Sequence, residues 1–544
     1  MTTNRREFVV TSASSIIALS GAPAFLKRQG THDIILRDGF ILDGSGFDNK
    51  GTQDVAISNG RITAIAERIS GRGTEEISAT GKVIAPGFID LHSPGDGNRR
   101  EDPRMESLVR QGITTIVVGQ DGSSRTVGDQ GAGASAGGFA AMLSATEAAK
   151  PAVNLMSMIG LGSVRSRVVG ANDRPATPDE LRQMVGMVES ALAEGACGAS
   201  SGLEYTPGAF ASTEELIALC RPLAARRLPY ATHMRNEDDR LLDSIDESIA
   251  VARGARCPLQ ISHLKTQGPR NWAKLDTVFE RVESAARDGI DVAFDRYPYI
   301  AYATGLTNLF PVWSRDGGTD AFLARLADTA VSPRVKAETL AKVDLIGGWE
   351  NVHISAVRAP EDKAAEGKRL GAYAKSINAD PYDLTVAMLN RNRGSIGMVG
   401  FAMSEENLDR ILAHPRGMVA SDGGSFAIEG PTRSGSPHPR GLGTFPRVLG
   451  RYVRERKALT LSQAVHKMTA LPASRIRLAD RGKLGVGLAA DVVVLDPARV
   501  ADVATFEQPF QYPTGIDVVI VNGSIALREG QRGSRMTGRV LRPA

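Results

Sequence analysis

Residues 229–235 read PYATHMR, and residues 259–265 read LQISHLK. Each stretch is a short apolar run that reaches a histidine, His233 in the first and His263 in the second. A longer run of helical character separates them, which is the pattern of a parallel βα unit. Because the carboxyl ends of neighbouring parallel strands lie at the same edge, we expect the two imidazoles to converge.

The same alternation of short apolar runs and longer helical runs continues along the chain. Eight such units can close on themselves, so we predict an α/β fold built on a (β/α)8 TIM barrel at 86–479. The stretch at about 305–370 has no strand of this type and is expected to be an insertion. The eight expected strands are VIAPGFIDLH (83–92), ITTIVVGQD (113–121), AVNLMSMIG (152–160), CGASSGLEY (197–205), PYATHMR (229–235), LQISHLK (259–265), DVAFDRYPY (291–299) and GMVASDGG (417–424).

Both ends of the remaining chain have a different pattern, with short β-prone runs around tight turns. Asn59-Gly60 lies in DVAISNGRITAIA (54–66), and Asn522-Gly523 lies in DVVIVNGSIALREG (517–530). Asn-Gly between two such runs is a strong signal for a β-hairpin. We therefore predict a small β-sandwich domain made from 31–85 plus 480–544.

Residues 1–30 read as a targeting segment. Arg5 and Arg6 precede a mildly apolar stretch and the small-residue site Ala22-Pro23-Ala24. This pattern resembles a twin-arginine export signal, and an amphipathic or disordered tail is the alternative. We expect the twin-arginine translocase of a bacterium to export the chain, which would then be periplasmic or secreted.

The composition excludes several classes of protein. The 544 residues are 42% hydrophobic and 23% charged, which is ordinary for a globular chain. A net charge of +4 gives no case for nucleic-acid binding. The apolar runs are too short for a stable membrane span. The three cysteines, Cys197, Cys220 and Cys257, form no disulfide or metal-binding spacing and are expected to be buried thiols.

Three of the eight histidines fall at expected strand ends: His92, His233 and His263. Imidazoles in such positions can bind a divalent ion, most plausibly zinc. The alternative for each is a hydrogen-bonded core histidine. Asp121 ends the second expected strand and is a candidate third ligand, although Asp before Gly-Ser-Ser is also typical of a turn or a helix cap.

Four further residues are candidates for catalysis or substrate binding. Asp422 ends the last expected strand, where a carboxylate can act as general base, with a turn as the alternative. Lys265 follows His263 by two residues and shares its side of an extended strand. Lys265 and Arg440 can hold a substrate carboxylate, and Tyr299 can donate a hydrogen bond to it or to a developing oxyanion. A rim or loop role is the alternative for each.

Nine segments together resemble the D-aminoacylase, or N-acyl-D-amino-acid deacylase, family of the amidohydrolase superfamily. The resemblance spans nearly all of the chain after residue 30. The segments are VIAPGFIDLH, QGITTIVVGQDG, GASSGLEYTPG, THMRNE, QISHLK, DRYPY, SDGG, HPRGLGTFPRVLGRYVRE (438–455) and VHKMTALPASRIRLADRGKLGVGLAADVVVLDP (465–497).

The resemblance implies a barrel capped by a β-sandwich, a zinc ion, and hydrolysis of the amide bond of N-acyl-D-amino acids. It assigns tight zinc binding to His233 and His263 and the role of catalytic base to Asp422. It assigns substrate contacts to Lys265, Tyr299 and Arg440.

The chain departs from the family pattern at three strand ends. His92-Ser93-Pro94 stands where the family has His-x-His, Gln120-Asp121-Gly122 stands where it usually has Asn-Cys-Gly, and Gly160-Leu161-Gly162 stands where it has Gly-His-Gly. Pro94 removes a ligand of the second, weaker metal position, so we expect one tightly bound ion. His92 is then a partial ligand or a hydrogen-bond donor.

The expected function is zinc-dependent hydrolysis of an N-acyl-D-amino acid, a small-molecule substrate. The first alternative is a cyclic-amide hydrolase of the dihydroorotase or hydantoinase kind. Such enzymes usually carry a carboxylated lysine on the fourth strand, and the run ACGASSGLEY has none. The second alternative is a catalytically inactive barrel that binds a ligand without cleaving it.

Overall fold

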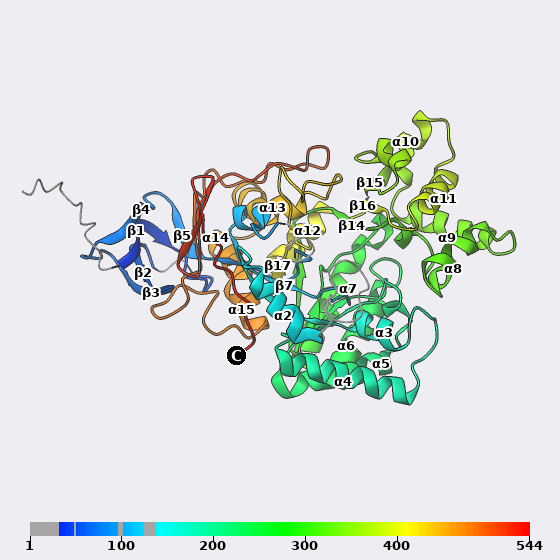
Figure 1. The fold of residues 1–544 in the computed structure, drawn as a ribbon, viewed down its shortest axis with the longest axis horizontal. Coiled ribbons are helices and arrows are strands. Elements are labelled where there is room, and N and C mark those ends of the chain that lie inside the picture. The colour runs from blue at the N-terminus through cyan, green and yellow to red at the C-terminus, as the bar shows by residue number, and fades with distance from the viewer. Residues whose placement is uncertain (1–31, 48–49, 96–101, 125–137) are drawn as a thin grey trace, which may run out of the picture.

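Strands from both ends of the chain lie in one nine-stranded sheet at one end of the molecule (Figure 1). The computed structural model describes residues 32–47, 50–95, 102–124 and 138–544. The sheet order is β21-β20-β19-β18-β5-β1-β2-β3, with β4 beside β1. Its strands are β1 (His32–Ile41), β2 (Thr52–Ser58), β3 (Arg61–Ala66), β4 (Gly73–Ser78), β5 (Val83–Pro86), β18 (Val492–Leu495), β19 (Ile516–Val521), β20 (Ser524–Arg528) and β21 (Gln531–Arg532).

The two Asn-Gly turns form hairpins and pack against each other. Asn59 and Gly60 have φ of 53° and 76°, and Asn522 and Gly523 have φ of 49° and 78°. Positive φ at both central residues is what a type I′ turn requires, and asparagine followed by glycine tolerates it best. A Cβ on Gly523 would lie 2.5 Å from the Cα of Gly60, so the contact between the turns also requires glycine.

The strands expected from the eight apolar runs are present and pair in parallel, in chain order except that β17 follows β13. They form a three-stranded sheet, β6-β7-β8, and a six-stranded sheet, β9-β10-β11-β12-β13-β17. The mixed α/β fold is confirmed. The bounds are β6 (Phe88–Asp90), β7 (Ile113–Val118), β8 (Asn154–Ser157), β9 (Ile159–Gly160), β10 (Ala199–Gly202), β11 (Tyr230–His233), β12 (Leu259–Ile261), β13 (Val292–Arg296) and β17 (Gly417–Val419).

Helices connect these strands and cover them with apolar side chains. In α4 (Pro178–Glu194), Thr177 and Glu180 form a capping box at the start, and Gly195 with φ of 114° ends the helix. The other helices around the parallel strands are α1 (Glu106–Arg110), α2 (Gly138–Ala148), α3 (Leu161–Val168), α5 (Thr213–Cys220), α6 (Leu241–Ala255), α7 (Leu275–Arg287), α12 (Glu405–Ala413), α13 (Arg440–Arg447), α14 (Leu461–Met468) and α15 (Ala470–Arg475).

The segment between β13 and α12 is longer than the insertion expected at 305–370. It contains an antiparallel sheet of order β14-β16-β15, whose outer members pair with a strand far away in sequence. Its helices lie at the opposite end of the molecule from the nine-stranded sheet (Figure 1). Its elements are β14 (Ala301–Gly305), α8 (Thr319–Ala327), α9 (Ser332–Leu345), β15 (Val352–Ala356), α10 (Leu370–Ser376), α11 (Pro381–Arg391) and β16 (Gly397–Phe401).

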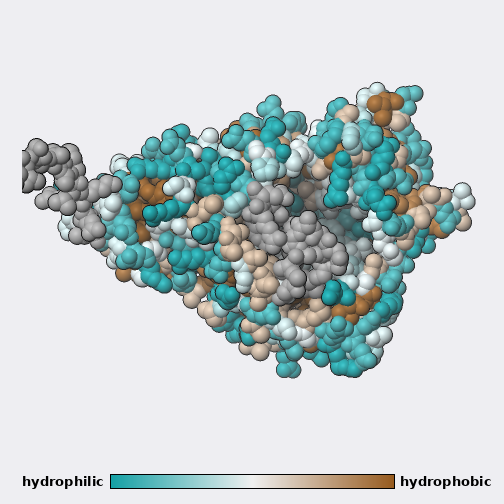
Figure 2. Space-filling model, viewed as in Figure 1, coloured by the Kyte–Doolittle hydropathy of each residue, from teal (hydrophilic) through white to brown (hydrophobic). Residues whose placement is uncertain are grey.

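The surface seen in Figure 2 is mainly hydrophilic, with hydrophobic residues in small separate patches. All three cysteines are free and buried, as expected. In the described part of the chain, no helix is both long and apolar enough to cross a membrane. The predicted export signal lies outside the described residues.

A buried polar network joins the nine-stranded sheet to β8. The carboxylate of Asp491 pairs with the guanidinium of Arg481, and its oxygens accept hydrogen bonds from the Asn154 side chain at 2.9 Å and the Asn522 backbone N–H at 2.6 Å. The Asn522 amide donates to the Asn154 side-chain oxygen at 2.7 Å. The Asp491 carboxylate accepts from three partners, and buried polar groups that are paired in this way stabilise a fold.

Removal of this carboxylate should destabilise the protein strongly. Asp491→Ala leaves the Arg481 charge buried without its partner, a change that costs about 3–5 kcal/mol. The free energy of unfolding from chemical denaturation measures this loss. Asp288→Ala is the control, because its ion pair with Arg253 is more than half exposed on both sides and contributes little. Equal losses in the two variants would contradict the account.

Candidate metal centre

The structure brings the imidazoles of His233 and His263 into direct contact. His233 is the last residue of β11, and His263 lies two residues beyond β12. Their nitrogens, His233 Nδ1 and His263 Nε2, are 2.9 Å apart, and both side chains are buried. The two strands are neighbours in the parallel sheet, so the contact follows from the strand-end geometry that their sequences predict.

His92 and Asp121 complete a cluster with His263. His92 Nε2 lies 3.2 Å from Asp121 Oδ2, and His263 Nε2 lies 3.5 Å from Asp121 Oδ1. The described residues contain two groups that can hold a metal ion, His92 with Asp121 and His263, and His233 with Glu237 and His263. The two groups share His263, which makes it the central ligand candidate.

Three residues of the site have an unusual left-handed backbone conformation. His263, Asp121 and Asp422 all have positive φ, at 36°, 52° and 48°, in a region that side chains other than glycine rarely adopt. The backbone N–H of His263 donates to the buried carboxylate of Asp295 at 2.9 Å, and the N–H of Asp422 donates to the His92 carbonyl at 2.8 Å. Strained residues of this kind concentrate at functional sites.

The side chains present fit a divalent cation. The cluster offers imidazole nitrogens and carboxylate oxygens, which are zinc ligands. Within the group of His92, Asp121 and His263, the nitrogen–oxygen separations of 3.2 and 3.5 Å allow one ion to contact all three side chains. Asp121 Oδ1 is a buried atom without a hydrogen-bond partner, and such an orphaned acceptor points to a group that it binds.

The electrostatics favour a cation as well. Burial by itself would lower the pKa of His92, but the carboxylates of Asp121 and Asp422 outweigh it and raise that pKa well above its ordinary value. Burial would raise the pKa of Asp121, yet His92 and His263 hold it well below its ordinary range. The carboxylates therefore draw positive charge into the cluster, which a divalent ion can supply.

Lys265 contacts the second of the two candidate metal groups, which consists of His233, Glu237 and His263. Its Nζ lies 2.5 Å from Glu237 Oε1 and 2.6 Å from His263 Nδ1, and the side chain is buried. Gln267 donates to the other oxygen of Glu237 at 2.8 Å. The group that contains Glu237 thus holds an ammonium, and the group of His92, Asp121 and His263 is the better candidate for the metal.

Asp422 and Arg440 lie together at the edge of the cluster. Asp422 Oδ1 is 3.6 Å from His92 Nε2, and Asp422 Oδ2 is 2.8 Å from Arg440 Nη1. Arg440 is the first residue of α13, and its guanidinium lies over the ring of Tyr297, 4.7 Å from the centroid. A proton acceptor and a cation suited to a carboxylate therefore stand side by side next to the metal candidate.

Tyr299, the expected substrate contact, packs against the residues that precede α13. Its buried hydroxyl is directed at the Pro439 carbonyl, 3.5 Å away, and its ring packs against His438 and Arg447. The tyrosine that faces the cluster is Tyr297, whose ring centroid is 6.5 Å from that of His263 and whose buried hydroxyl has no partner. Tyr297 is therefore a second candidate, beside Tyr299, for the contact with the substrate.

Sequence reasoning missed four residues of the site: Glu204, Glu237, Asp295 and Tyr297. Asp295 lies in β13, where its buried carboxylate could have been suspected from its place near the end of the strand. Tyr297 and Tyr299 both lie beyond the end of β13 at Arg296, where the two-residue periodicity of a strand no longer applies. Glu204 and Glu237 follow the ends of β10 and β11, and no local pattern marks them.

Comparison with known proteins agrees with this geometry. The model of the amidohydrolase family matches residues 75–526. The chain belongs to the D-aminoacylase family of the amidohydrolases. It is 35% identical to an N-acyl-D-glutamate deacylase of Alcaligenes xylosoxydans xylosoxydans, over 94% of this chain and 96% of that protein.

Two solved structures are similar over nearly their whole length. The N-acyl-D-glutamate deacylase of Bordetella bronchiseptica, in complex with zinc and a phosphonate inhibitor that mimics the tetrahedral intermediate, is 32% identical with a TM-score of 0.79, covering 94% of this chain and 99% of that chain. A D-aminoacylase described by one-metal activation and second-metal attenuation of its binuclear centre is 33% identical with a TM-score of 0.78, covering 94% and 100%. Metal centres in these relatives and the ligand groups found here support a divalent metal.

Loss of the shared ligand should abolish metal binding. His263→Ala removes a ligand from both groups, so the purified variant should contain less than about a tenth of the metal of the parent protein, since a tetrahedral site needs its full ligand set. Elemental analysis measures the content. His32→Ala, far from the cluster on β1, is the matched control and should retain its metal. Full metal content in His263→Ala would exclude this site.

Proposed function

We propose that this protein hydrolyses the amide bond of N-acyl-D-amino acids, releasing a carboxylate and a free D-amino acid. The observation that carries the proposal is the placement of Asp422 between His92 of the metal candidate and the guanidinium of Arg440. This arrangement combines a site for the scissile amide, a proton acceptor and a partner for the α-carboxylate. Similarity to N-acyl-D-amino-acid deacylases over 94% of the chain supports the same reaction.

We propose that the parallel strands, with β8 and β9 as two parts of one strand, close into a (β/α)8 barrel whose carboxyl end holds this site. The support is a set of hydrogen bonds at the open edges of the two parallel sheets. The backbone N–H of Asp422, beyond β17, donates to the His92 carbonyl beyond β6, and Ser421 N–H donates to Asp90 Oδ1 at 2.8 Å. On the other side, β8 and β9 are separated by Met158 alone. The nine-stranded sheet would then be the separate β-sandwich domain.

We propose zinc as the metal, with one tightly held ion per chain. His92, Asp121 and His263 would hold it, with His233 beside them, and Lys265 occupies the neighbouring acidic group. Bound there, zinc supplies Lewis-acid activation of the water and of the amide carbonyl. Elemental analysis of the parent protein should give about one zinc per chain, and two ions that are both needed for activity would contradict the proposal.

The side chains of the protein itself move the proton and position the substrate. Asp422 accepts a proton from the attacking water and delivers it to the nitrogen of the leaving amine. Arg440 binds the α-carboxylate of the substrate, which places the amide next to Asp422. Tyr297 has a free hydroxyl to donate to the same carboxylate or to the developing oxyanion. Lys265 positions Glu237 and His263.

Neither alternative fits the residues as well. A cyclic-amide hydrolase of the hydantoinase kind would carry a lysine on the fourth strand, and β10 reads Ala-Ser-Ser-Gly. An inactive binding protein agrees with Pro94 and Leu161, which stand where the family carries histidines. It gives no reason for a strained aspartate, Asp422, beside the metal candidate.

Replacement of the proposed base should stop turnover without removing the metal. Asp422→Asn keeps the shape of the side chain but cannot accept the proton, so kcat on an N-acetyl-D-amino acid should fall by about two to four orders of magnitude. Metal content and KM should change much less, because the ligands and Arg440 are intact. Near-normal turnover in the metal-loaded variant would remove Asp422 from the mechanism, and loss of the metal would make Asp422 a ligand.

We also propose export through the twin-arginine translocase, on the sequence of residues 1–30 alone. Receptors of this kind read the arginine pair, so replacing Arg5 and Arg6 by lysine should retain the protein in the cytoplasm. Cell fractionation of a bacterial host measures the distribution. Normal amounts of the double-lysine variant in the periplasm would contradict the proposal.

A further inference from the structure

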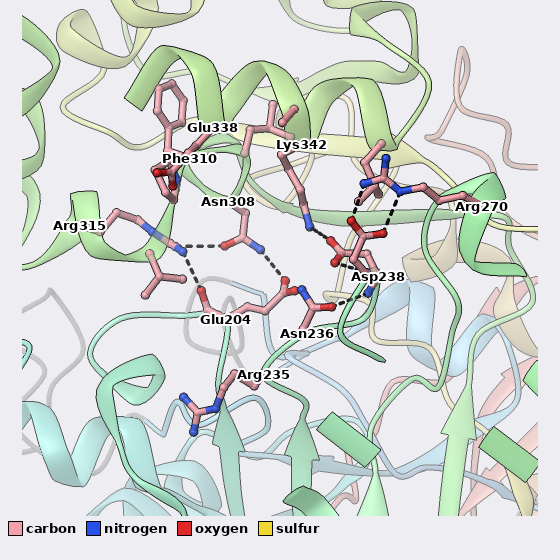
Figure 3. Close-up of a pocket in the computed structure, with 16 residues that line it drawn as sticks. Glu204, Arg235, Asn236, Asp238, Arg270, Asn308, Phe310, Arg315, Glu338 and Lys342 are labelled. Atoms are coloured by element: carbon pink, nitrogen blue, oxygen red, sulfur yellow. Dashed lines mark hydrogen bonds and ion pairs between the residues drawn. The ribbon is translucent and has the colours of Figure 1, made fainter. Parts of the chain in front are cut away.

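A cavity of about 300 Å³ lies between the parallel strands and the segment that contains α9 (Figure 3). Glu204, just beyond β10, forms part of its wall, and Glu204 Oε2 lies 3.5 Å from His233 Nε2. Across the cavity, 309–312 contribute apolar side chains. Its volume is at the lower end of the range for ligand pockets, which suits one branch of a small substrate.

Most charged groups of the wall are already paired. Lys342 pairs with Asp238, Arg270 with Asp239, and Arg235 with Glu247 outside the cavity. Glu338 accepts hydrogen bonds from Arg334 and Trp313, at 2.8 and 2.9 Å. Figure 3 shows Arg235 directed away from the row formed by Arg315, Asn308 and Glu204. Of the charged residues that line the cavity, Arg315 and Glu204 make no ion pair with a lysine or arginine, aspartate or glutamate side chain in the described structure.

The carboxylate of Glu204 contacts two neighbouring side chains. Its Oε2 accepts a hydrogen bond from Asn308 at 3.2 Å and faces His233 Nε2. A carboxylate beside a histidine nitrogen helps to orient that ring. Glu204 therefore supports His233, and it makes no ion pair with Arg315.

Arg315 is a buried cation that lacks an anionic partner in the described structure. The side chain is 8% exposed, and its two hydrogen bonds go to neutral acceptors, Asn308 Oδ1 at 3.2 Å and the Glu204 carbonyl at 3.0 Å. Its Nε has no partner. Burial lowers the pKa of the Arg315 guanidinium by more than the nearby groups Glu204 and Tyr205 raise it. Buried charges in proteins are normally paired, so this guanidinium is a candidate to bind an anion.

We propose that Arg315 binds a second carboxylate of the substrate, so that the enzyme prefers dicarboxylic N-acyl-D-amino acids. The guanidinium fork matches a carboxylate, and the apolar wall at 309–312 accommodates the methylene groups that precede it. The second carboxylate belongs to an acidic side chain, as in D-glutamate, or to an acyl chain, as in a succinyl group. The inference rests on the proposed function and names the substrate class of the same site.

Matched substrates test the preference in the metal-loaded parent protein. The kcat/KM for N-acetyl-D-glutamate should exceed that for N-acetyl-D-glutamine by about 10–100-fold, because only the acid pairs with the buried guanidinium. A comparison of N-succinyl-D-leucine with N-acetyl-D-leucine tests the acyl chain in the same way. The pair that shows the preference identifies the source of the carboxylate, and no preference in either pair overturns the inference.

Variants of Arg315 then test the residue. Arg315→Met should lower kcat/KM for the preferred acid by about 100-fold and for its neutral counterpart by less than about 5-fold. Arg315→Lys keeps the charge and should retain part of the preference. It provides a second test should Arg315→Met perturb folding. Arg270→Met is the control, because that guanidinium lines the same cavity but is half-exposed and paired with Asp239. Equal losses on acid and neutral substrates in Arg315→Met would give Arg315 a structural role and overturn the proposal.

The failure of this inference is distinct from the failure of the proposed function. If N-acetyl-D-leucine and N-acetyl-D-glutamine are hydrolysed as fast as N-succinyl-D-leucine and N-acetyl-D-glutamate, the deacylase function stands and the proposed role of Arg315 is wrong. Absence of hydrolysis of all four compounds by metal-loaded protein overturns both.

Discussion

Two buried imidazole nitrogens, on His233 and His263, face each other at 2.9 Å, and the site is organised around that contact. It exists because β11 and β12 are parallel neighbours whose carboxyl ends lie at one edge. Asp295 holds the backbone N–H of His263 in a strained conformation with φ of 36°, and Lys265 approaches the other ring nitrogen. Backbone strain and buried charge both cost free energy, so the contacts that surround the cluster must outweigh that cost.

Contacts far from the site support the strands and loops that form it. The two ends of the chain meet where β5 pairs with β18, and the network around Asp491 fastens that sheet to β8. On the opposite side, Asn308 and Arg315 contact Glu204, which in turn faces His233. The metal candidate therefore lies between a sheet that supports the parallel strands and a long segment that lines the cavity. The first contributes stability, and the second contains Arg315, for which we propose a role in substrate selection.

Local sequence patterns predict the parallel strands because each is an apolar run ending in a polar residue. The same rule finds His92, Asp121, His233, His263 and Asp422, since strand ends converge wherever the strands are parallel. Pairing between β14, β15 and β16 joins residues up to a hundred positions apart, and no local pattern reports it. Glu204 and Glu237 lie in loops after strands, where side-chain direction depends on tertiary contacts. Sequence alone does not distinguish Tyr297 from Tyr299, because both follow the end of β13 and their directions depend on tertiary contacts.

The central claim is that this cluster and Asp422 hydrolyse an N-acyl amide with selectivity for the D configuration. Chiral analysis of the products from a racemic N-acetyl amino acid, after incubation with zinc-loaded protein, tests it most directly. The account predicts that the free D-amino acid accumulates until half of the racemate is consumed, while the N-acetyl-L-amino acid remains. Release of the L-amino acid, or of neither enantiomer from several racemates, would contradict the account.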